Sequence, residues 1–248
     1  MKVEALTQVQ ILRIHAASLA ILERVGVEVP HEEILNRFSD TGAKVDHATK
    51  RVRIPPALVE KLVAGAGKTF TLAGRDATRL AEFGRGKRNY NATAGEAYWI
   101  DEPGKPRRWC SLQDVATAAR FGDALPNITI PGAMSDPHEL PVAARCVEVA
   151  ATMLRNTTKP VYFWFHDRAS ARFLVEIAVA VRGTAKEAAK APPFMPFFEP
   201  ISPLRFPFNG IDLLFETARA GLPVPVGPMA QMGLSAPATR AGTMALEN

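Results

Sequence analysis

The side chains of this sequence that could do chemistry follow short apolar segments spaced at regular intervals. Glu199 comes directly after an aromatic run at 194–198, and His166 follows an apolar run at 160–165. Carboxylates, imidazoles and amides at the ends of buried strands can bind or orient a substrate. The full set of such candidates is Ser135, Asp136 and His138, then His166 and Asp167, then Glu199 and Ser202, and finally Met229, Gln231 and Ser235.

These residues include the types that serve as metal ligands and as acid–base groups. Asp136 and His138 have the types needed for a metal site, but no second cluster of ligands accompanies them, so we expect no metal. His166 beside Asp167 has the type of a general base, although a lone histidine is more often a hydrogen-bonded wall residue. The chain contains no glycine-rich phosphate loop, nucleophile elbow or Cys/His pairing. The patterns therefore identify no catalytic residue.

Aromatic side chains gather on two of the apolar segments. Strand alternation places Tyr162, Trp164 and His166 on one face, with the two phenylalanines between them on the other. Core packing is one interpretation of these rings, and the other is an aromatic cage that binds a quaternary ammonium group through cation–π attraction. Glu199, among aromatic neighbours, would either have a raised pKa or remain ionised to face a cation. Strand position and the cage interpretation together predict substrate contacts from Glu199, His166, Trp164, Phe197 and Gln231.

The apolar segments recur with a period of about 30–34 residues. Segments starting at 128, 160, 194 and 223 have the composition of strands, and a helix pattern follows each one. Such alternation is typical of βαβ units in a parallel sheet, and no strand is followed by the G-x-G-x-x-G turn of a dinucleotide fold. We therefore predict an α/β fold that is the first half of a TIM-like (β/α)8 barrel.

The predicted βα units cover residues 126–248, and an irregular α+β segment at 1–125 precedes them. A closed barrel needs eight such units, so we expect the natural protein to continue for about 120–130 residues or more. An open four-stranded sheet and a half-barrel that dimerises are the alternatives. The last predicted helix starts at 236, with Ser235 as its N-cap.

Capping residues predict the elements of the first 125 residues. Gly26 is placed to end a helix in a left-handed conformation, Pro30 to open the next helix, Pro55 and Pro56 together to open a third, and Ser111 to open a capping box. The predicted helices are 6–25, 30–42, 55–66 and 111–124, with a hairpin at 45–54 and strands at 69–73, 90–94 and 97–100.

The composition is that of an ordinary globular protein, with 47% hydrophobic and 22% charged residues and a net charge of +5. There is no apolar run of membrane length and no signal peptide, so we expect a cytoplasmic protein without membrane contact. Cys110 and Cys146 match no metal or redox spacing and are expected to be reduced thiols. The basic segment 75–88 lacks interleaved aromatics, so we expect a solvated face or a surface for an acidic protein, and no nucleic-acid binding.

The sequence also resembles the trimethylamine methyltransferase (MttB-like) family. Each matching segment is short, but together they span nearly the whole chain in the family order. The segments are LERVGVEVP at 22–30, VRIPP at 52–56, FTLAGRD at 70–76, DALPNI at 123–128, RNTTKP at 155–160, PISPL at 200–204, AGLPV at 220–224 and SAPATRAG at 235–242.

This resemblance implies a TIM-like barrel about twice as long as this chain. It also implies transfer of a methyl group from trimethylamine or a quaternary amine such as glycine betaine to the cobalt of a corrinoid on a separate partner protein. We therefore expect no directly bound cofactor, a small amine substrate and a homo-oligomer, with this chain inactive by itself. Trimethylamine-specific members carry pyrrolysine in the second half of the barrel, outside this chain, so the substrate stays open. A non-catalytic betaine-binding protein and an unrelated barrel lyase are the alternatives.

Overall fold

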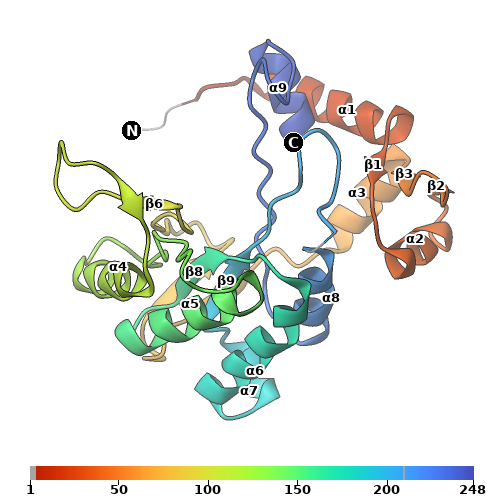
Figure 1. Cartoon of the computed structure of the whole chain (residues 1–248). Coiled ribbons are helices and arrows are strands. Elements are labelled where there is room, and N and C mark those ends of the chain that lie inside the picture. The colour runs from red at the N-terminus through yellow and green to blue at the C-terminus, as the bar shows by residue number, and fades with distance from the viewer. Residues whose placement is uncertain (1–3, 209) are drawn as a thin grey trace. The chain divides into compact units, whose positions relative to one another are not determined.

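The computed structural model describes residues 4–208 and 210–248. The described chain (Figure 1) divides into two compact units. Unit 1 contains the residues up to 66 together with 199–208 and 227–248, and unit 2 contains 67–198 and 210–226.

Unit 1 begins with the long amphipathic helix α1 (Gln8–Arg24), whose first turn is closed by a capping box between Thr7 and Gln10. Gly26 follows the helix with a φ of 75°, and a Cβ there would lie 2.3 Å from the carbonyl oxygen of Val52. The prediction that this glycine ends the helix in a left-handed conformation is therefore confirmed.

A three-stranded antiparallel sheet follows α1 and contains the predicted hairpin. Its strands are β1 (Val27–Glu28), β2 (Lys44–Asp46) and β3 (Arg51–Arg53), in the order β1-β3-β2. The short strand β1 escaped prediction because two residues carry no alternation pattern. In the same unit, Arg205 pairs with Glu28 through a parallel bridge.

Among the helices of unit 1 after α1, two starts differ from the prediction and one agrees. Helix α2 (Glu32–Ser39) starts two residues after Pro30, because its N-cap His31 keeps an extended backbone. Helix α3 (Pro56–Gly65) starts at the predicted proline. The third is α9 (Arg240–Glu247), capped by Thr239, which accepts a hydrogen bond from the Gly242 amide at 3.2 Å. The predicted cap, Ser235, instead closes a turn by accepting from the Gln231 amide at 3.0 Å.

Unit 2 opens with two antiparallel hairpins and a helix. The hairpins are β4 (Phe70–Ala73) with β5 (Leu80–Phe83) and β6 (Tyr98–Trp99) with β7 (Arg108–Trp109). Helix α4 (Leu112–Ala124) carries the predicted capping box at Ser111. The predicted strand at 90–94 is reduced to a single parallel bridge between Asn91 and Ile130.

The centre of unit 2 is parallel, as predicted. Strand β8 (Val161–Trp164) pairs with β9 (Phe194–Phe197) in parallel. Parallel bridges join Gly132 to Tyr162 and Phe198 to Val226, so the four predicted strands are neighbours in chain order. The outer two form single bridges and not full strands. The result is a mixed α/β fold without a closed barrel among the described residues.

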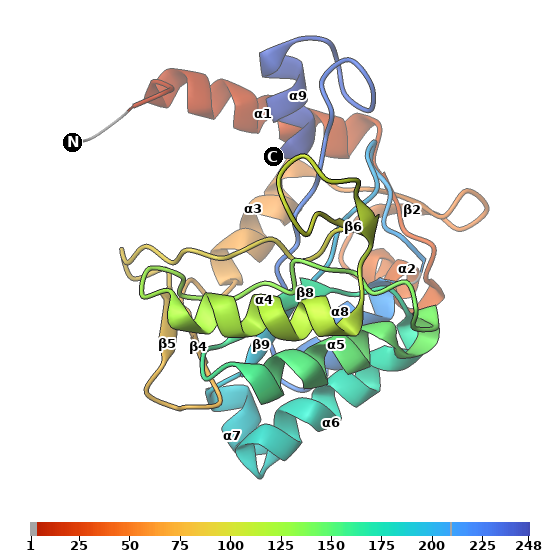
Figure 2. The same ribbon diagram turned by 60° about the vertical axis from the view of Figure 1, so that its left-hand side comes forward.

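Helices separate these parallel segments along the chain. Helix α5 (Val142–Asn156) precedes β8, and α6 (Ala171–Arg182) follows it after the short 3-10 turn Arg168–Ser170. Helix α7 (Ala185–Lys190), which was not predicted, precedes β9, and α8 (Ile211–Arg219) follows β9. Helix α5 lies between α4 and α6, and both contact it (Figure 2). None of the described helices is long and apolar enough to span a membrane.

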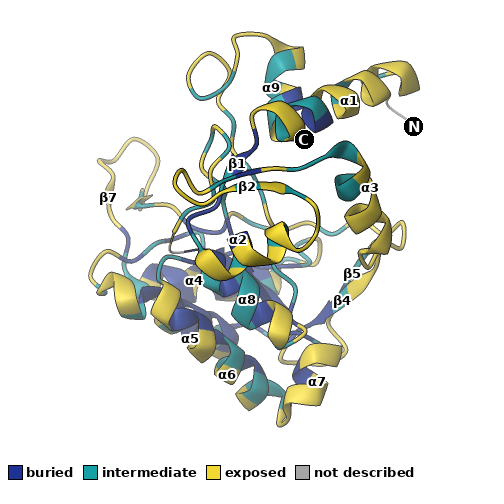
Figure 3. Cartoon of the chain, turned by 90° about the vertical axis from the view of Figure 1, so that its right-hand side faces the viewer, coloured by how far each residue is buried: buried dark blue, intermediate teal, exposed yellow. Residues whose placement is uncertain are grey.

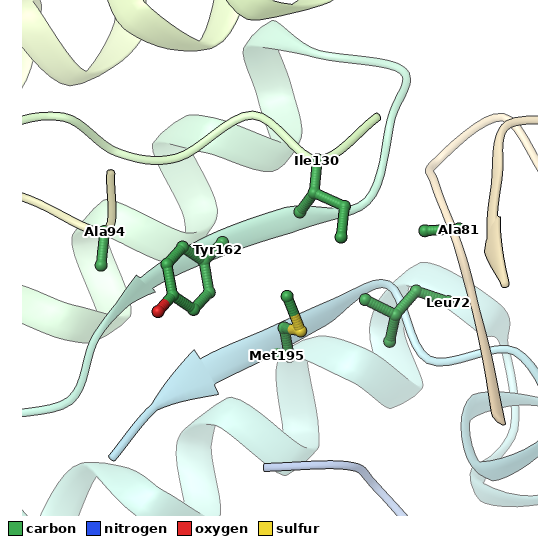
Figure 4. Packing of buried hydrophobic residues seen from close by; sticks show 6 residues of the cluster. All are labelled: Leu72, Ala81, Ala94, Ile130, Tyr162 and Met195. Carbon is green, nitrogen blue, oxygen red and sulfur yellow. The ribbon is translucent and has the colours of Figure 1, made fainter. Parts of the chain in front are cut away.

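The parallel strands β8 and β9 are buried on both faces. Phe163 and Phe194 are fully buried and pack edge to face at 5.5 Å between ring centroids. The exposed residues of the neighbouring helices lie on their outer sides (Figure 3). A cluster of buried hydrophobic residues joins β4, β5, β8, β9 and two loops. Its members are Leu72, Ala81, Ala94, Ile130, Tyr162 and Met195 (Figure 4).

A buried lysine ties α4 to the start of β8. The Nζ of Lys159 donates hydrogen bonds to the carbonyl oxygens of Gly122 at 2.9 Å, Leu125 at 2.7 Å and Ile128 at 2.8 Å. These acceptors belong to the last turn of α4 and the residues after it, so the ammonium satisfies carbonyls that the helix leaves open and opposes the negative end of its dipole. All three protons of the ammonium are used, which makes Lys159 a structural residue.

Candidate functional site

Three charged or polar side chains meet at the ends of the parallel strands of unit 2. The Nε2 atom of His166, just beyond β8, lies 2.9 Å from Oδ1 of Asp136. The second carboxylate oxygen of Asp136 accepts a hydrogen bond from Nη1 of Arg145 at 3.0 Å. Arg145, on α5, is buried and also donates to the Leu140 carbonyl at 3.0 Å. Both oxygens of the carboxylate are thus occupied.

The ionised form of Asp136 is favoured despite its burial. Desolvation acts to raise the pKa of this carboxyl, but the hydrogen bond from His166 and the charge of Arg145 outweigh it and hold the pKa below the ordinary value of 3.8. The negative charge of the Asp136 carboxylate is balanced by the positive charge of the Arg145 guanidinium. The group therefore offers polar atoms to a ligand without a net charge of its own.

This paired carboxylate predicts how stability depends on acid. Because the folded-state pKa of Asp136 is lowered, its contribution to stability is present above about pH 3.8 and is lost as the pH falls through the lower folded value. We expect Asp136→Asn to remove this part of the acid dependence, as measured by urea unfolding at a series of pH values from about 2 to 7. An unchanged difference in unfolding free energy between pH 6 and pH 3 in the variant would contradict the pairing.

Aromatic rings lie beside this polar group on the same strand ends. Phe197 contacts the ring of Trp164 at 4.7 Å and that of Tyr162 at 5.5 Å, both edge to face. The indole Nε1 of Trp164 donates to the carbonyl oxygen of Gly95 at 2.8 Å. A Cβ on Gly95 would lie 3.0 Å from both the indole and the Ser135 carbonyl oxygen, so glycine allows this close approach. The indole orientation is therefore fixed.

The β6–β7 hairpin packs on the loop that carries Asp136. The Trp109 ring packs against the His138 ring in a tilted arrangement, with centroids 4.4 Å apart, and Tyr98 stacks on Trp109 at 4.5 Å. The Nδ1 atom of His138 lies 2.8 Å from the backbone carbonyl of Asp136, and because a carbonyl only accepts, this nitrogen carries the proton. The hairpin rings thus pack against His138 at this point of the loop.

The structure brings together three of the five predicted substrate contacts. His166, Trp164 and Phe197 lie at neighbouring strand ends of unit 2. The other two predicted contacts belong to unit 1. Glu199 is half-buried there, and burial raises the pKa of its carboxyl as the sequence suggested. Gln231 is exposed and starts the turn closed by Ser235.

Sequence reasoning missed the role of Arg145 and the pairing of Asp136. Asp136 appeared only as a strand-end residue and a weak metal candidate. The available signal was Arg145 itself, an arginine beside Cys146 on the face of α5 that also buries Val149. A charge at a core position requires a partner, and the carboxylates near Arg145 in the sequence include Asp136, nine residues earlier. Among the residues described, no three His, Cys, Asp or Glu side chains gather as a metal site would need.

The similarity of this chain to known proteins extends over its whole length. Residues 1–248 match the family model of trimethylamine methyltransferase (MTTB). The chain is 32% identical over 240 residues to the trimethylamine methyltransferase MttB of Desulfitobacterium hafniense strain DSM 10664 / DCB-2, which covers 96% of this chain and 48% of that protein.

Two further relatives have similar coverage. The glycine betaine methyltransferase of Desulfitobacterium hafniense strain Y51 is 27% identical over 248 residues, covering 100% of this chain and 51% of that protein. The trimethylamine methyltransferase MttB of Methanosarcina thermophila is 29% identical over 266 aligned positions, covering 98% and 51%. The chain spans about half the length of the curated relatives it matches.

Proposed function

This chain belongs to the trimethylamine methyltransferase (MTTB) family, and from that premise we propose that the protein takes a methyl group from a small methylated amine. Its relatives are named for trimethylamine and for glycine betaine. At neutral pH both compounds present a cationic nitrogen surrounded by methyl groups. The proposed substrate class is therefore a tertiary or quaternary N-methylammonium compound.

The aromatic group at the ends of β8 and β9 is the observation that carries this proposal. Trp164, Phe197 and Tyr162 lie on one face of the sheet, and Trp164 is held by its hydrogen bond to Gly95. A ring face attracts a cation by about 0.5–2 kcal/mol, with the larger values where water is excluded. Methyl groups on the nitrogen add apolar surface that the same rings can cover. Such a surface suits a methylated ammonium better than a hydrated one.

The charge of the substrate needs a further partner. Asp136 is neutralised by Arg145, so it does not serve as the counter-ion. We propose Glu199 for that role, because a half-buried carboxyl with a raised pKa gains from a nearby cation that favours its ionised form. Gln231 is proposed as a further contact from its position after the fourth parallel segment. Both assignments rest on strand position in the chain.

The methyl acceptor in this proposal is the cobalt of a corrinoid on a separate partner protein, which supplies a strong nucleophile. In the transfer, the bond between the methyl carbon and nitrogen breaks, and its electron pair stays on the departing amine. The part left to this protein is to hold one N-methyl group in line with the acceptor and to exclude water. The aromatic rings suit that role because they bind the methyl groups without offering a nucleophile.

The proposed architecture agrees with this function. We propose that residues 126–248 form the first four units of a TIM-like barrel after a segment at 1–125, and that the strand ends face the substrate. The consecutive parallel neighbours of unit 2 support this proposal, as does the helix between each pair of them. A cytoplasmic homo-oligomer is proposed with it.

Replacing Trp164 with leucine tests the proposal. The variant keeps an apolar side chain but loses the ring face, so we expect affinity for trimethylammonium or tetramethylammonium to fall by about 3- to 30-fold. Binding can be measured by isothermal titration calorimetry on this chain. Trp109→Leu is the matched control, because that indole packs against His138 and should leave amine affinity unchanged.

Two results would count against the proposal. One is that neither amine binds the unsubstituted protein, and the other is that Trp109→Leu weakens binding as much as Trp164→Leu. A protein that binds the amine but whose full-length form passes no methyl group to a corrinoid acceptor would favour the alternative of a non-catalytic binding protein.

A further inference from the structure

We infer that Asp136 is a positioning residue that sets His166 as a hydrogen-bond acceptor at Nδ1, and that this acceptor distinguishes tertiary from quaternary ammonium ligands. The first part rests on contacts within unit 2 alone. The second part rests on the proposed function. Neither part requires Asp136 to touch the ligand.

The contacts of the Asp136 carboxylate determine which nitrogen of His166 carries a proton. An ionised carboxylate only accepts hydrogen bonds, so the His166 nitrogen at 2.9 Å from Oδ1 must carry a proton. That nitrogen is Nε2. In the neutral imidazole the other nitrogen, Nδ1, then has a free lone pair. Within the part of the chain that the structure describes, Nδ1 makes no hydrogen bond.

Arg145 makes this arrangement specific for a carboxylate. A guanidinium can only donate, so the Asp136 oxygen that Arg145 contacts at 3.0 Å must remain an acceptor. An asparagine at position 136 has one oxygen and one NH₂ group. If the oxygen serves Arg145, the NH₂ group faces Nε2 of His166, which must then accept. The proton would move to Nδ1, and His166 would present a donor where it had a lone pair.

The ligand chemistry follows from that lone pair. A trimethylammonium ion has one N–H group, which needs an acceptor when it leaves water, whereas tetramethylammonium has none. An Nδ1 acceptor favours the first ion, and an Nδ1 donor opposes it. The tautomer of His166 therefore changes the preference between the two ions while the aromatic surface stays the same.

The test is nitrogen NMR of the five imidazoles in the 15N-labelled protein at a mildly alkaline pH of about 8, where histidine in general is neutral. His166→Gln and His138→Gln assign the two signals. We expect the proton of His166 on Nε2, and we expect Asp136→Asn to move it to Nδ1. His138 is the internal control, because its Nδ1 proton is held by the backbone carbonyl of Asp136 and should not respond.

A double variant separates positioning from general disturbance. Asp136→Asn combined with Arg145→Met frees the asparagine oxygen to accept from Nε2, so the proton should return to its original nitrogen. Damage to the fold would not produce this reversal. An unchanged His166 tautomer in Asp136→Asn, or no return in the double variant, would overturn the positioning role.

Titration of the same proteins with trimethylammonium and tetramethylammonium chloride tests the ligand preference. We expect Asp136→Asn to weaken trimethylammonium binding relative to tetramethylammonium by about tenfold, and the double variant to restore the ratio. A tautomer that moves while the ratio stays constant would overturn the acceptor role of Nδ1. Failure of both ions to bind the unsubstituted protein would overturn the proposed function and leave the tautomer result standing.

Discussion

Replacing Lys159 with methionine should lower the free energy of unfolding by about 3–5 kcal/mol, because one buried and two half-buried carbonyl oxygens lose an ammonium donor at once. Lys159 is buried, with only 5% of the residue surface exposed. Methionine fills a similar volume, so the loss comes from the hydrogen bonds and from the uncapped end of α4 more than from packing. Urea unfolding followed by circular dichroism measures the change.

The matched control is Lys186→Met on the exposed surface of α7. This substitution should change the free energy of unfolding by less than about 0.5 kcal/mol, as surface substitutions usually do. Equal stability of the two variants would show that the ammonium of Lys159 is dispensable to the fold.

Phe163→Ala should have an effect of similar size for a different reason. Phe163 is fully buried in β8 and its ring contacts Phe194, so truncation removes apolar contact and leaves a cavity between strand and helices. Core truncations of phenylalanine cost about 3–5 kcal/mol, and we expect a correspondingly lower midpoint in urea.

Phe121→Ala provides the comparison for this truncation. Phe121 lies on the outer side of α4 with 58% of its surface exposed, so the same change of residue type should cost less than about 1 kcal/mol. A cost for Phe163→Ala no larger than that of Phe121→Ala would show that β8 is not a packed central strand.

The parallel core was predictable because its signals are local and strong. The runs at 160–165 and 194–198 are apolar without alternation, as strands covered on both faces are, and both became paired strands. The cap at Ser111 and the glycine at position 26 depend on short-range backbone chemistry, and both were confirmed. Whether these units close into a barrel stays a prediction.

Other features could not be predicted because they depend on competition or on distant partners. Ser235 and Thr239 lie four residues apart and are both residue types that favour an N-cap. Ser235 accepts a hydrogen bond within the turn at Gln231, and Thr239 caps α9. Helix α7 has only six residues, too few for a helical period to stand out. The group formed by Asp136 and His166 joins residues 30 positions apart, a separation at which the sequence carries no pairing pattern.

The three indole N–H signals of the 15N-labelled protein report directly on whether the strand ends of unit 2 bind a methylated ammonium ion. Adding tetramethylammonium chloride should shift the Trp164 signal in a saturable way, because its ring is predicted to face the ion. Trp99 and Trp109 lie in the β6–β7 hairpin, and their signals should stay in place. A Trp164 signal that does not move, or a shift confined to Trp99 and Trp109, would contradict the account.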